Sequence, residues 1–119
     1  APEDVDYIAP SGIGLASVDR AEAIAISAVF GAWMPQLALG LHTGVTGFGE
    51  GGHAVLGLVG ALQTMQDGLV APTVNLDRPW GPMTEAALTS VPVPRTVRRA
   101  VILATSPEGT LAALAIAAP

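Results

Sequence analysis

The two histidines of this sequence, His42 and His53, are the first residues to test for a chemical role. A metal site would need a third ligand such as Glu50, and these residues do not follow the spacing of a metal-ligand pattern. A general base would need a nucleophile and an orienting acid, and the sequence offers no such set. Ser11, in a glycine-rich loop without a paired base, is predicted to be a small loop residue. We therefore expect His42 and His53 to be surface or packed side chains.

The stretch Gly47–Gly52 satisfies the GxGxxG pattern and opens a predicted helix. Backbone amides at such a helix start can cradle a pyrophosphate. Three features weaken this interpretation. Glu50 would place a carboxylate beside the phosphates, the preceding strand is not the first of a complete βαβ unit, and the acidic residue expected about twenty positions later falls at Asp67 or beyond, near the helix end. A small nucleotide-binding α/β protein stays open as an alternative.

Strands and helices are predicted to alternate along the chain. The apolar pattern predicts a strand at 5–8 that ends by Pro10, a loop at 11–14, a helix at 20–30, a strand at 37–39, a helix at 51–66, an irregular segment at 69–82, and a hairpin with arms at 100–104 and 111–118 joined by a turn at 106–109. This β-α-β-α-β-β order is typical of an α/β unit with a mostly parallel sheet and an antiparallel end.

Several residues predict how the helices begin, end and pack. Asp19 and Glu22 have the spacing of an N-cap and its capping-box partner. Gly31 is expected to end the first helix as a left-handed cap. Gly57 and Gly60 lie inside the second helix, where glycine costs about 1 kcal/mol relative to alanine. Close backbone packing against another element is the expected compensation at both positions.

The composition predicts one small domain that needs a partner. The chain has 119 residues, of which 50% are hydrophobic and 13% are charged. Such a chain is not intrinsically disordered, and it carries fewer charges than soluble domains usually do. A domain of this size buries only about 60–70% of its unfolded surface. The apolar excess therefore indicates an obligate subunit with a buried partner surface.

Charge and cysteine content exclude several classes of protein. Ten acidic residues, five arginines and no lysine give a formal charge of −5, which disfavours nucleic acid as a partner. The cluster of Arg95, Arg98 and Arg99 is predicted to be a solvated edge or an interface contact. No apolar run approaches the ~18–20 residues that span a bilayer, and no signal peptide is visible. The absence of cysteine excludes disulfides and thiolate chemistry and fits a cytoplasmic protein.

Four segments resemble the carboxy-terminal part of the β-ketoacyl synthase family, and together they run nearly end to end. They are VDYIAPSGIGLASVDRAEAIAISAVFG, TGFGEGG, DGLVAPTVNLDRP and RRAVILATSPEGTLAALAIA. The first resembles the stretch around the family's first active-site histidine, and the second stands where the family has TGH. The third resembles the family's PPT-containing loop and is the most specific match. The resemblance implies a thiolase-type fold over residues 1–119 as a single ketosynthase-like segment.

The departures from the family pattern lie at the catalytic positions. Ser11 stands at the place of the first catalytic histidine, Phe48 at the place of the second, and Thr43 at the place of the supporting lysine. The nucleophilic cysteine belongs to the half of the family fold that this chain lacks. Condensation needs a thiolate to take the acyl group and imidazoles to stabilise developing charge. The resemblance therefore implies a chain that is not an enzyme by itself and that needs no cofactor or metal.

Within the family, this loss of catalytic residues resembles the chain length factors, the noncatalytic partners of ketosynthases in type II polyketide synthases. The resemblance implies a catalytic ketosynthase subunit as partner, a further chain carrying the missing amino-terminal portion, and indirect contact with acyl carrier protein. Phe48, Ser11 and Thr43 are the candidates for contact with an acyl or polyketide chain in a tunnel. The alternative is a purely structural assembly subunit. Separate encoding and cleavage ahead of Ala1 are both open.

Overall fold

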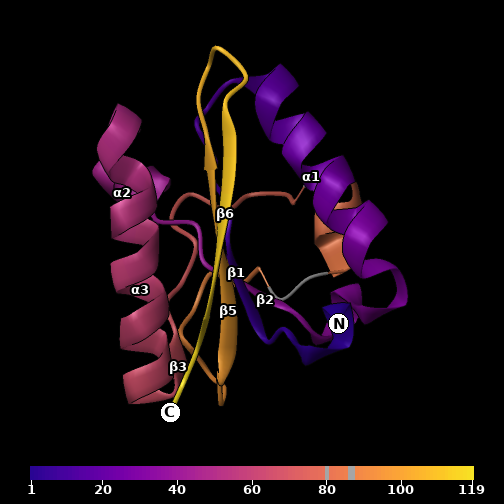
Figure 1. Ribbon diagram of the computed structural model, residues 1–119, viewed down its shortest axis with the longest axis vertical. Helices are drawn as coiled ribbons and strands as arrows, with labels where there is room; N and C mark the ends of the chain where they lie inside the picture. The colour runs from indigo at the N-terminus through magenta and orange to yellow at the C-terminus, as the bar shows by residue number, and fades with distance from the viewer. Residues whose placement is uncertain (80, 86–87) are drawn as a thin grey trace.

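The computed structural model describes residues 1–79, 81–85 and 88–119. A four-stranded sheet forms the centre, with α3 against one face and α1 beside the other (Figure 1). The strands are β1 (Tyr7–Ala9), β2 (Ala38–Leu39), β3 (Leu69–Val70), β4 (Val93–Pro94), β5 (Arg99–Thr105) and β6 (Leu111–Ala117). The α-helices are α1 (Ala16–Phe30), α2 (Thr43–Thr46) and α3 (His53–Asp67), and the 3-10 helices are η1 (Pro2–Asp4), η2 (Gly31–Gln36), η3 (Glu50–Gly52) and η4 (Gly81–Glu85).

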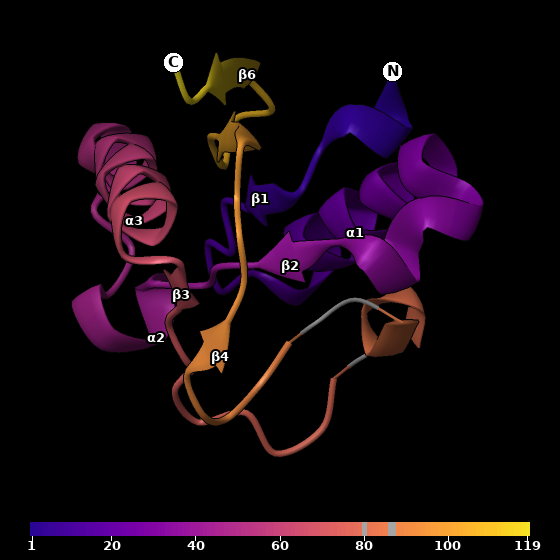
Figure 2. The same ribbon diagram turned by 90° about the horizontal axis from the view of Figure 1, so that it is seen from below.

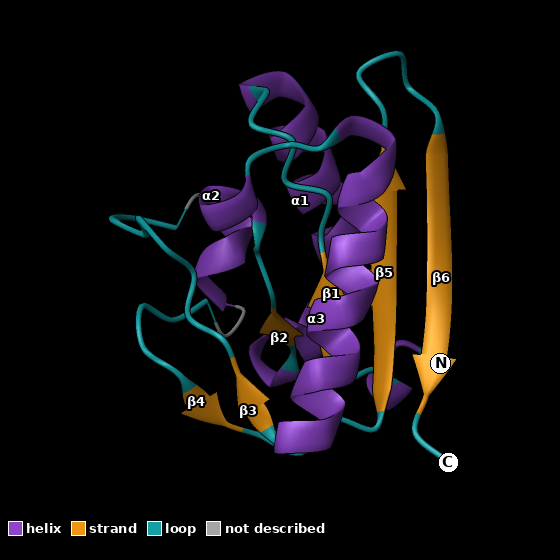
Figure 3. Ribbon diagram, turned by 90° about the vertical axis from the view of Figure 1, so that its left-hand side faces the viewer, coloured by secondary structure: helices purple, strands orange, loops and turns teal. Residues whose placement is uncertain are grey.

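The strand order in the main sheet is β2-β1-β5-β6. β1 pairs in parallel with both β2 and β5, and β6 closes the sheet as an antiparallel edge strand (Figure 3). The β5–β6 register runs without a break from Arg99↔Ala117 to Thr105↔Leu111. The predicted α/β class, with a mostly parallel sheet and an antiparallel end, is therefore confirmed.

Two hydrophobic clusters pack on opposite faces of this sheet, because successive residues of a strand point to opposite sides. Tyr7 and Ala9 of β1 belong to the cluster under α3, whereas Ile8 between them belongs to the cluster under α1. All three are buried. The end-on view in Figure 2 shows the two helices separated by the strands. The same alternation places Ala38 under α3 and Leu39 under α1.

The helix prediction was wrong at the start of α1. The helix begins at Ala16, and its N-cap, Leu15, makes no side-chain capping bond. Asp19 therefore lies inside the first turn, where its carboxylate accepts a hydrogen bond from the Gly14 backbone N–H at 3.1 Å. Glu22 bonds to the preceding loop instead of forming a capping box with Asp19. Gly31 ends α1 with a positive φ of 46°, although its ψ of −121° lies outside the left-handed helical region that the prediction named.

The glycines of α3 fulfil the packing prediction at one position only. A Cβ at Gly57 would lie 3.3 Å from the Ala9 Cβ and 3.5 Å from the Ile102 Cγ2, so the helix backbone lies directly on the sheet there. A Cβ at Gly60 would meet no atom within 4 Å, and the prediction was wrong for that residue. Gly68 ends the helix in the left-handed conformation with φ 65°. The predicted second helix is confirmed, with its start at His53.

The carboxy-terminal hairpin is confirmed, and it is closed by a tight turn. Ser106 donates its N–H to the Thr110 carbonyl at 2.9 Å, and Gly109 donates to the Ser106 carbonyl at 3.0 Å. The prediction of an irregular segment at 69–82 was wrong at both of its ends. β3 pairs with β4 in a small second sheet, and η4 begins at Gly81. Trp80 lies outside the described residues.

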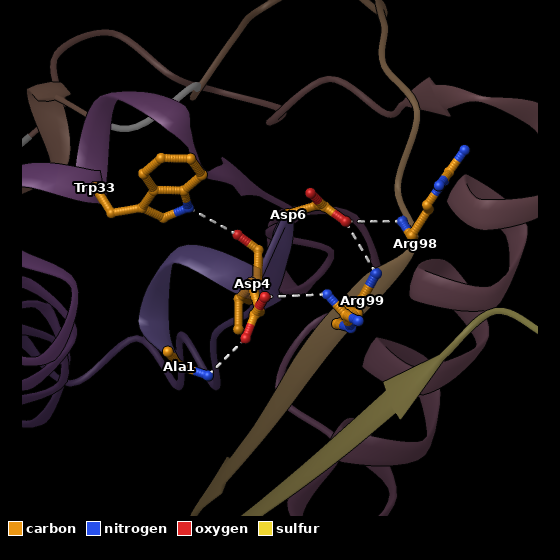
Figure 4. Close-up of polar contacts among 7 residues, drawn as sticks. Ala1, Asp4, Asp6, Trp33, Arg98 and Arg99 are labelled. Carbon is orange, nitrogen blue, oxygen red and sulfur yellow. Dashed lines mark hydrogen bonds and ion pairs between the residues drawn. The ribbon is translucent and has the colours of Figure 1, made fainter.

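Polar contacts fasten the amino-terminal segment to β5 (Figure 4). One carboxylate oxygen of Asp6 accepts hydrogen bonds from the Arg98 and Arg99 backbone N–H groups, at 2.8 and 3.0 Å. The Arg99 guanidinium donates to Asp4 at 3.2 Å. The Arg98 and Arg99 residues are exposed, which agrees with the predicted solvated edge. On the other side of this segment, the Trp33 indole N–H donates to the Val5 carbonyl at 3.0 Å.

Candidate functional site

Ser11 is a buried residue that hydrogen-bonds to two partners, Thr105 and Glu22. It lies just beyond β1 and is only 1% exposed. Its hydroxyl donates a hydrogen bond of 3.0 Å to the Thr105 hydroxyl at the end of β5. Its backbone N–H and that of Gly12 donate to the Glu22 carboxylate, at 2.8 and 3.1 Å. Ser11 is therefore a fixed part of the fold, and its hydroxyl is bonded to another hydroxyl rather than to an imidazole or a carboxylate.

Phe48 lies in the loop between α2 and α3, where its ring packs on His53. The two ring centroids are 4.7 Å apart with the planes inclined by 50°. This loop bends at two residues with positive φ, Gly47 at 73° and Glu50 at 47°. Phe48 is half-buried and forms part of the wall of a cavity of about 330 Å³ between the start of α3 and the β5–β6 turn. Thr105, the partner of Ser11, lines the same cavity.

Thr43 lies in a different place, at the start of α2. It lines a larger cleft of about 940 Å³ that is bounded by α1, the loop that carries Gly12, and the segment 73–79. A Cβ at Gly12 would lie 3.2 Å from the Thr43 hydroxyl oxygen, so Thr43 contacts the same loop as Ser11. Ser11 is linked to Phe48 through Thr105, which bonds to Ser11 and lines the same cavity as Phe48. Its neighbour Gly12 lies against Thr43. The two candidates Phe48 and Thr43 therefore line separate cavities.

The two histidines are packed side chains, as predicted, and they are joined to each other. The His42 Nε2–H donates to the His53 carbonyl at 3.0 Å. Burial lowers the pKa of His42 below its ordinary value, against the opposing effect of this hydrogen bond. The His53 Nδ1 lies 2.5 Å from the Glu50 carbonyl, and its Nε2 is buried without a hydrogen-bond partner in the part of the chain that the structure describes. The position of His53 beside Phe48 was missed, because no motif places it at the candidate site.

The cavity next to Phe48 offers hydroxyl groups and apolar walls, and the chain has no thiol to act as a nucleophile. Within residues 1–79, 81–85 and 88–119, no cluster of three or more His, Cys, Asp or Glu side chains could hold a metal ion. In the same part of the chain, no helix has both the length and the apolar character needed to cross a membrane. The titratable side chains that line the cavity next to Phe48 are His53, Glu50 and Glu108.

Comparison with known proteins decides the family. The pattern described as "Beta-ketoacyl synthase, C-terminal domain" matches residues 1–77. The chain belongs to the β-ketoacyl synthase family. One β-ketoacyl synthase relative is the Nodulation protein E of Rhizobium meliloti, 31% identical over 113 residues, which are 95% of this chain and 28% of that protein. Another is the tetracenomycin polyketide synthase ketoacyl synthase beta subunit of Streptomyces glaucescens, 39% identical over 80 residues, 66% of this chain and 19% of that protein.

Solved β-ketoacyl synthase structures have the same fold over the whole chain. A type II polyketide synthase acyl-carrier protein in complex with its ketosynthase bound to the hexaketide matches with a TM-score of 0.91 at 20% identity, covering 100% of this chain and 29% of that one. The ishigamide ketosynthase/chain length factor matches with a TM-score of 0.85 at 23% identity, covering 98% of this chain and 28% of that one. The predicted thiolase-type fold is confirmed. The chain spans less than a third of the length of these relatives.

Proposed function

We propose that residues 1–119 form one noncatalytic segment that completes a ketosynthase assembly and helps to enclose an acyl or polyketide chain, in the manner of a chain length factor. The observation that carries this proposal is which side chains occupy the two positions where the family has catalytic histidines. Ser11 is buried and bonded to Thr105, and Phe48 is an aromatic wall residue. Neither can stabilise an oxyanion as an imidazole would.

The exposed face of α3 supports a further layer of protein over this segment. The relatives are more than three times as long as this chain, and α3 exposes a row of apolar side chains that a further layer would bury: Val55, Leu56, Val59 and Leu62. A helix that is apolar on its outer as well as its inner face is usually buried on both sides. The partners of this proposal are a catalytic ketosynthase subunit and a chain with the missing amino-terminal portion, and through them acyl carrier protein.

The test is co-expression of the chain with a ketosynthase and with a chain that carries the amino-terminal portion, followed by size exclusion and mass analysis. We expect all three to co-purify. Phe48→Ala, which enlarges the cavity, is then expected to change the length distribution of the products without loss of assembly. Val91→Ala, at a residue that is 60% exposed and lines neither cavity, is the control and should leave the product lengths unchanged.

Three outcomes would contradict the proposal at different points. Failure of the chain to co-purify with either partner would remove the proposed assembly. A Phe48→Ala complex that assembles and makes products of unchanged length would leave a purely structural subunit that never approaches the acyl chain. Condensing activity of the chain by itself would refute its noncatalytic status.

A further inference from the structure

The outer edge of β6 is a full strand edge that no other described strand covers. β6 is the last strand in the order β2-β1-β5-β6, and Figure 3 shows it at the margin of the sheet with no element beyond it. Its seven residues, LAALAIA, include no charge and no proline, and its register with β5 contains no bulge. Proteins use these features to protect an edge strand, because an unprotected edge pairs with another strand. The edge of β6 is therefore suited to pairing.

The hydrogen bonds of the hairpin show which backbone groups of β6 point outward. In an antiparallel pair, opposed residues that exchange hydrogen bonds alternate with opposed residues that do not. At one end of the hairpin the Ala118 N–H donates to the Arg98 carbonyl at 2.7 Å, and at the other the Ser106 N–H donates to the Thr110 carbonyl at 2.9 Å. The even-numbered residues of β6 therefore bond to β5. The odd-numbered residues direct their N–H and C=O groups away from β5: Leu111, Ala113, Ala115 and Ala117.

These outward groups match those of a second copy of the same strand. When two β6 strands run antiparallel about Leu114, Ala113 lies opposite Ala115 of the second copy, and Leu111 lies opposite Ala117. Both members of each such pair have outward N–H and C=O groups, so they can exchange two hydrogen bonds. Leu114 then faces Leu114 of the second copy as a pair without hydrogen bonds, where side chains approach most closely. Only the register centred on Leu114 pairs all four outward residues.

The side chains of the two strands also fit in this register. Leu111, which is 74% exposed, lies opposite Ala117 of the second copy, and Ile116 lies opposite Ala112. A large side chain meets a small one in both cases. Leu114, which is 48% exposed, packs on its own counterpart at the twofold axis. Apolar pairs of this kind across neighbouring strands stabilise a sheet, so the fit favours the same register as the backbone groups.

Charges at the two ends of the hairpin favour a second copy over an unrelated strand. Arg98 lies at one end of the β5–β6 pair and Glu108 in the turn at the other end, and both residues are exposed. Pairing about a twofold axis turns one copy end for end. Arg98 of each copy therefore comes to the same end of the joined sheet as Glu108 of the other copy. Opposite charges in such positions fix the orientation and register of two partners.

We propose that two copies of this chain associate through antiparallel pairing of their β6 strands about Leu114, which joins their four-stranded sheets into one continuous sheet. The contact is the same on both copies and closes the assembly at two. The strand at the opposite edge of each sheet, β2, is only two residues long. The pairing leaves the outer face of α3 free, so this proposal does not rest on the proposed function.

The test is sedimentation equilibrium of the full chain over a range of concentrations, with charged variants at the twofold axis. Leu114→Lys and Leu114→Glu each place two like charges opposite each other, and we expect each to weaken self-association by at least about tenfold. An equimolar mixture of the two variants places opposite charges there. We expect the mixture to form a heterodimer more tightly than either variant forms a homodimer.

The matched control carries the same charges at another position of the same strand. Leu111 lies opposite Ala117 of the second copy, so a mixture of Leu111→Lys and Leu111→Glu brings no two of the new charges face to face. We expect this mixture to gain much less than the mixture of position-114 variants. A chain that stays monomeric across the whole concentration range would overturn the proposal. Equal rescue by the two mixtures would overturn the register about Leu114.

Amide hydrogen exchange decides the question on the unaltered chain if a charged variant does not fold. In a single copy the Ala113 and Ala115 N–H groups point to solvent, whereas the Leu114 N–H bonds to β5. We expect exchange at Ala113 and Ala115 to become slower as the chain concentration rises, and exchange at Leu114 to be slow throughout. A dimer in which the Ala113 and Ala115 amides still exchange rapidly would place the contact on another surface and overturn the proposal.

Discussion

Glu22 shows how one carboxylate can shape the loop that carries Ser11. Its two oxygens accept the backbone N–H groups of Ser11 and Gly12, at 2.8 and 3.1 Å. Those two donors would otherwise lie unpaired in the partly buried space between β1 and α1, and an unpaired buried donor costs about 1–3 kcal/mol. The position of Ser11 thus depends on a residue eleven places away in the sequence, on the first turns of α1.

Replacing Glu22 should loosen this loop. We expect Glu22→Ala to lower the free energy of unfolding by about 1–3 kcal/mol, because both donors lose their acceptor, and Glu22→Gln to cost less, because one oxygen remains. Urea unfolding of the purified full chain measures the difference. Glu3→Ala, at an exposed position, is the control and should stay within about 0.5 kcal/mol of the unaltered chain. Equal losses of unfolding free energy in Glu22→Ala and Glu3→Ala would contradict the role of Glu22 in holding this loop.

His42 should make stability depend on pH in the weakly acidic range. Burial lowers its pKa in the folded chain, so the unfolded chain takes up a proton first as the pH falls. The free energy of unfolding then decreases between the unfolded pKa, about 6.5, and the lower folded pKa, and it is constant above that window. The contribution of His42 is therefore fully present at neutral pH and is lost on acidification.

The measurement is the urea midpoint at about pH 7.5 and about pH 5.5, on either side of the unperturbed histidine pKa. We expect a smaller decrease between the two in His42→Gln than in the unaltered chain, because the Gln amide can still donate to the His53 carbonyl while no longer titrating. An identical decrease in both proteins would show that other groups cause the pH dependence.

At the scale of elements, α3 packs on the sheet with its backbone close to the strands at Gly57. The helix backbone meets β1 and β5 at Gly57, where an added Cβ would lie 3.3 Å from Ala9 and 3.5 Å from Ile102. That approach lets Ala61 and Thr64, one and two turns further on, be buried as well. The loop with Phe48 and His53 stands at the start of the same helix, so the distance between α3 and the sheet also sets the width of the cavity that these residues line.

Two glycine substitutions on this helix should differ in sign. Gly60→Ala is expected to raise the free energy of unfolding of the full chain by about 0.5–1 kcal/mol, since it gains helix propensity and meets no atom. Gly57→Ala gains the same propensity but crowds Ala9, Ile102 and the His42 ring, and we expect it to lower stability. Thermal unfolding of the two variants tests this. An equal gain in stability in both would show that the residues around Gly57 move aside for an added Cβ at no cost.

At the scale of the whole molecule, the dominant feature is apolar surface that the chain cannot cover. On α3, Val55, Val59 and Leu62 are 59%, 55% and 51% exposed and follow one another at helical spacing. On the edge strand β6, Leu111 is 74% exposed and Leu114 is 48% exposed. Exposed apolar surface of this kind is typical of a face that another layer of protein covers, as the proposed function requires.

Making the outer face of α3 polar should therefore separate folding from assembly. We expect the double variant Val59→Gln, Leu62→Gln to reduce co-purification with the amino-terminal portion by at least about tenfold, because apolar burial at an interface core is lost. Its own unfolding midpoint should stay nearly unchanged. Val91→Gln, at a residue that is 60% exposed outside the helices, should assemble normally. Full assembly of the double variant would place the interface elsewhere.

The sequence by itself determined the elements and the family, because both depend on local patterns. Apolar periodicity located β1, α1, β2, α3 and the hairpin, glycine marked the ends of both long helices, and linear motifs pointed to the ketosynthase family and to positions 11, 43 and 48. Predictions were wrong where one sequence pattern fits two structures. Asp19 and Glu22 have capping-box spacing, yet both bond to the loop before α1, whose path depends on β1. Gly57 and Gly60 are both helix glycines, and only Gly57 lies on the side of α3 that faces the sheet.

Only the tertiary structure decided which residues meet. Ser11 and Thr105 are ninety-four positions apart, and their contact depends on β1 and β5 pairing in parallel. Phe48 and Thr43 are neighbours in the chain yet line separate cavities, because α2 and the glycine bends after it turn the backbone between them. His53 lies against the Phe48 ring and beside the Glu50 carbonyl, which no motif predicts. Contacts of this kind arise from packing between distant segments, and local sequence carries no record of them.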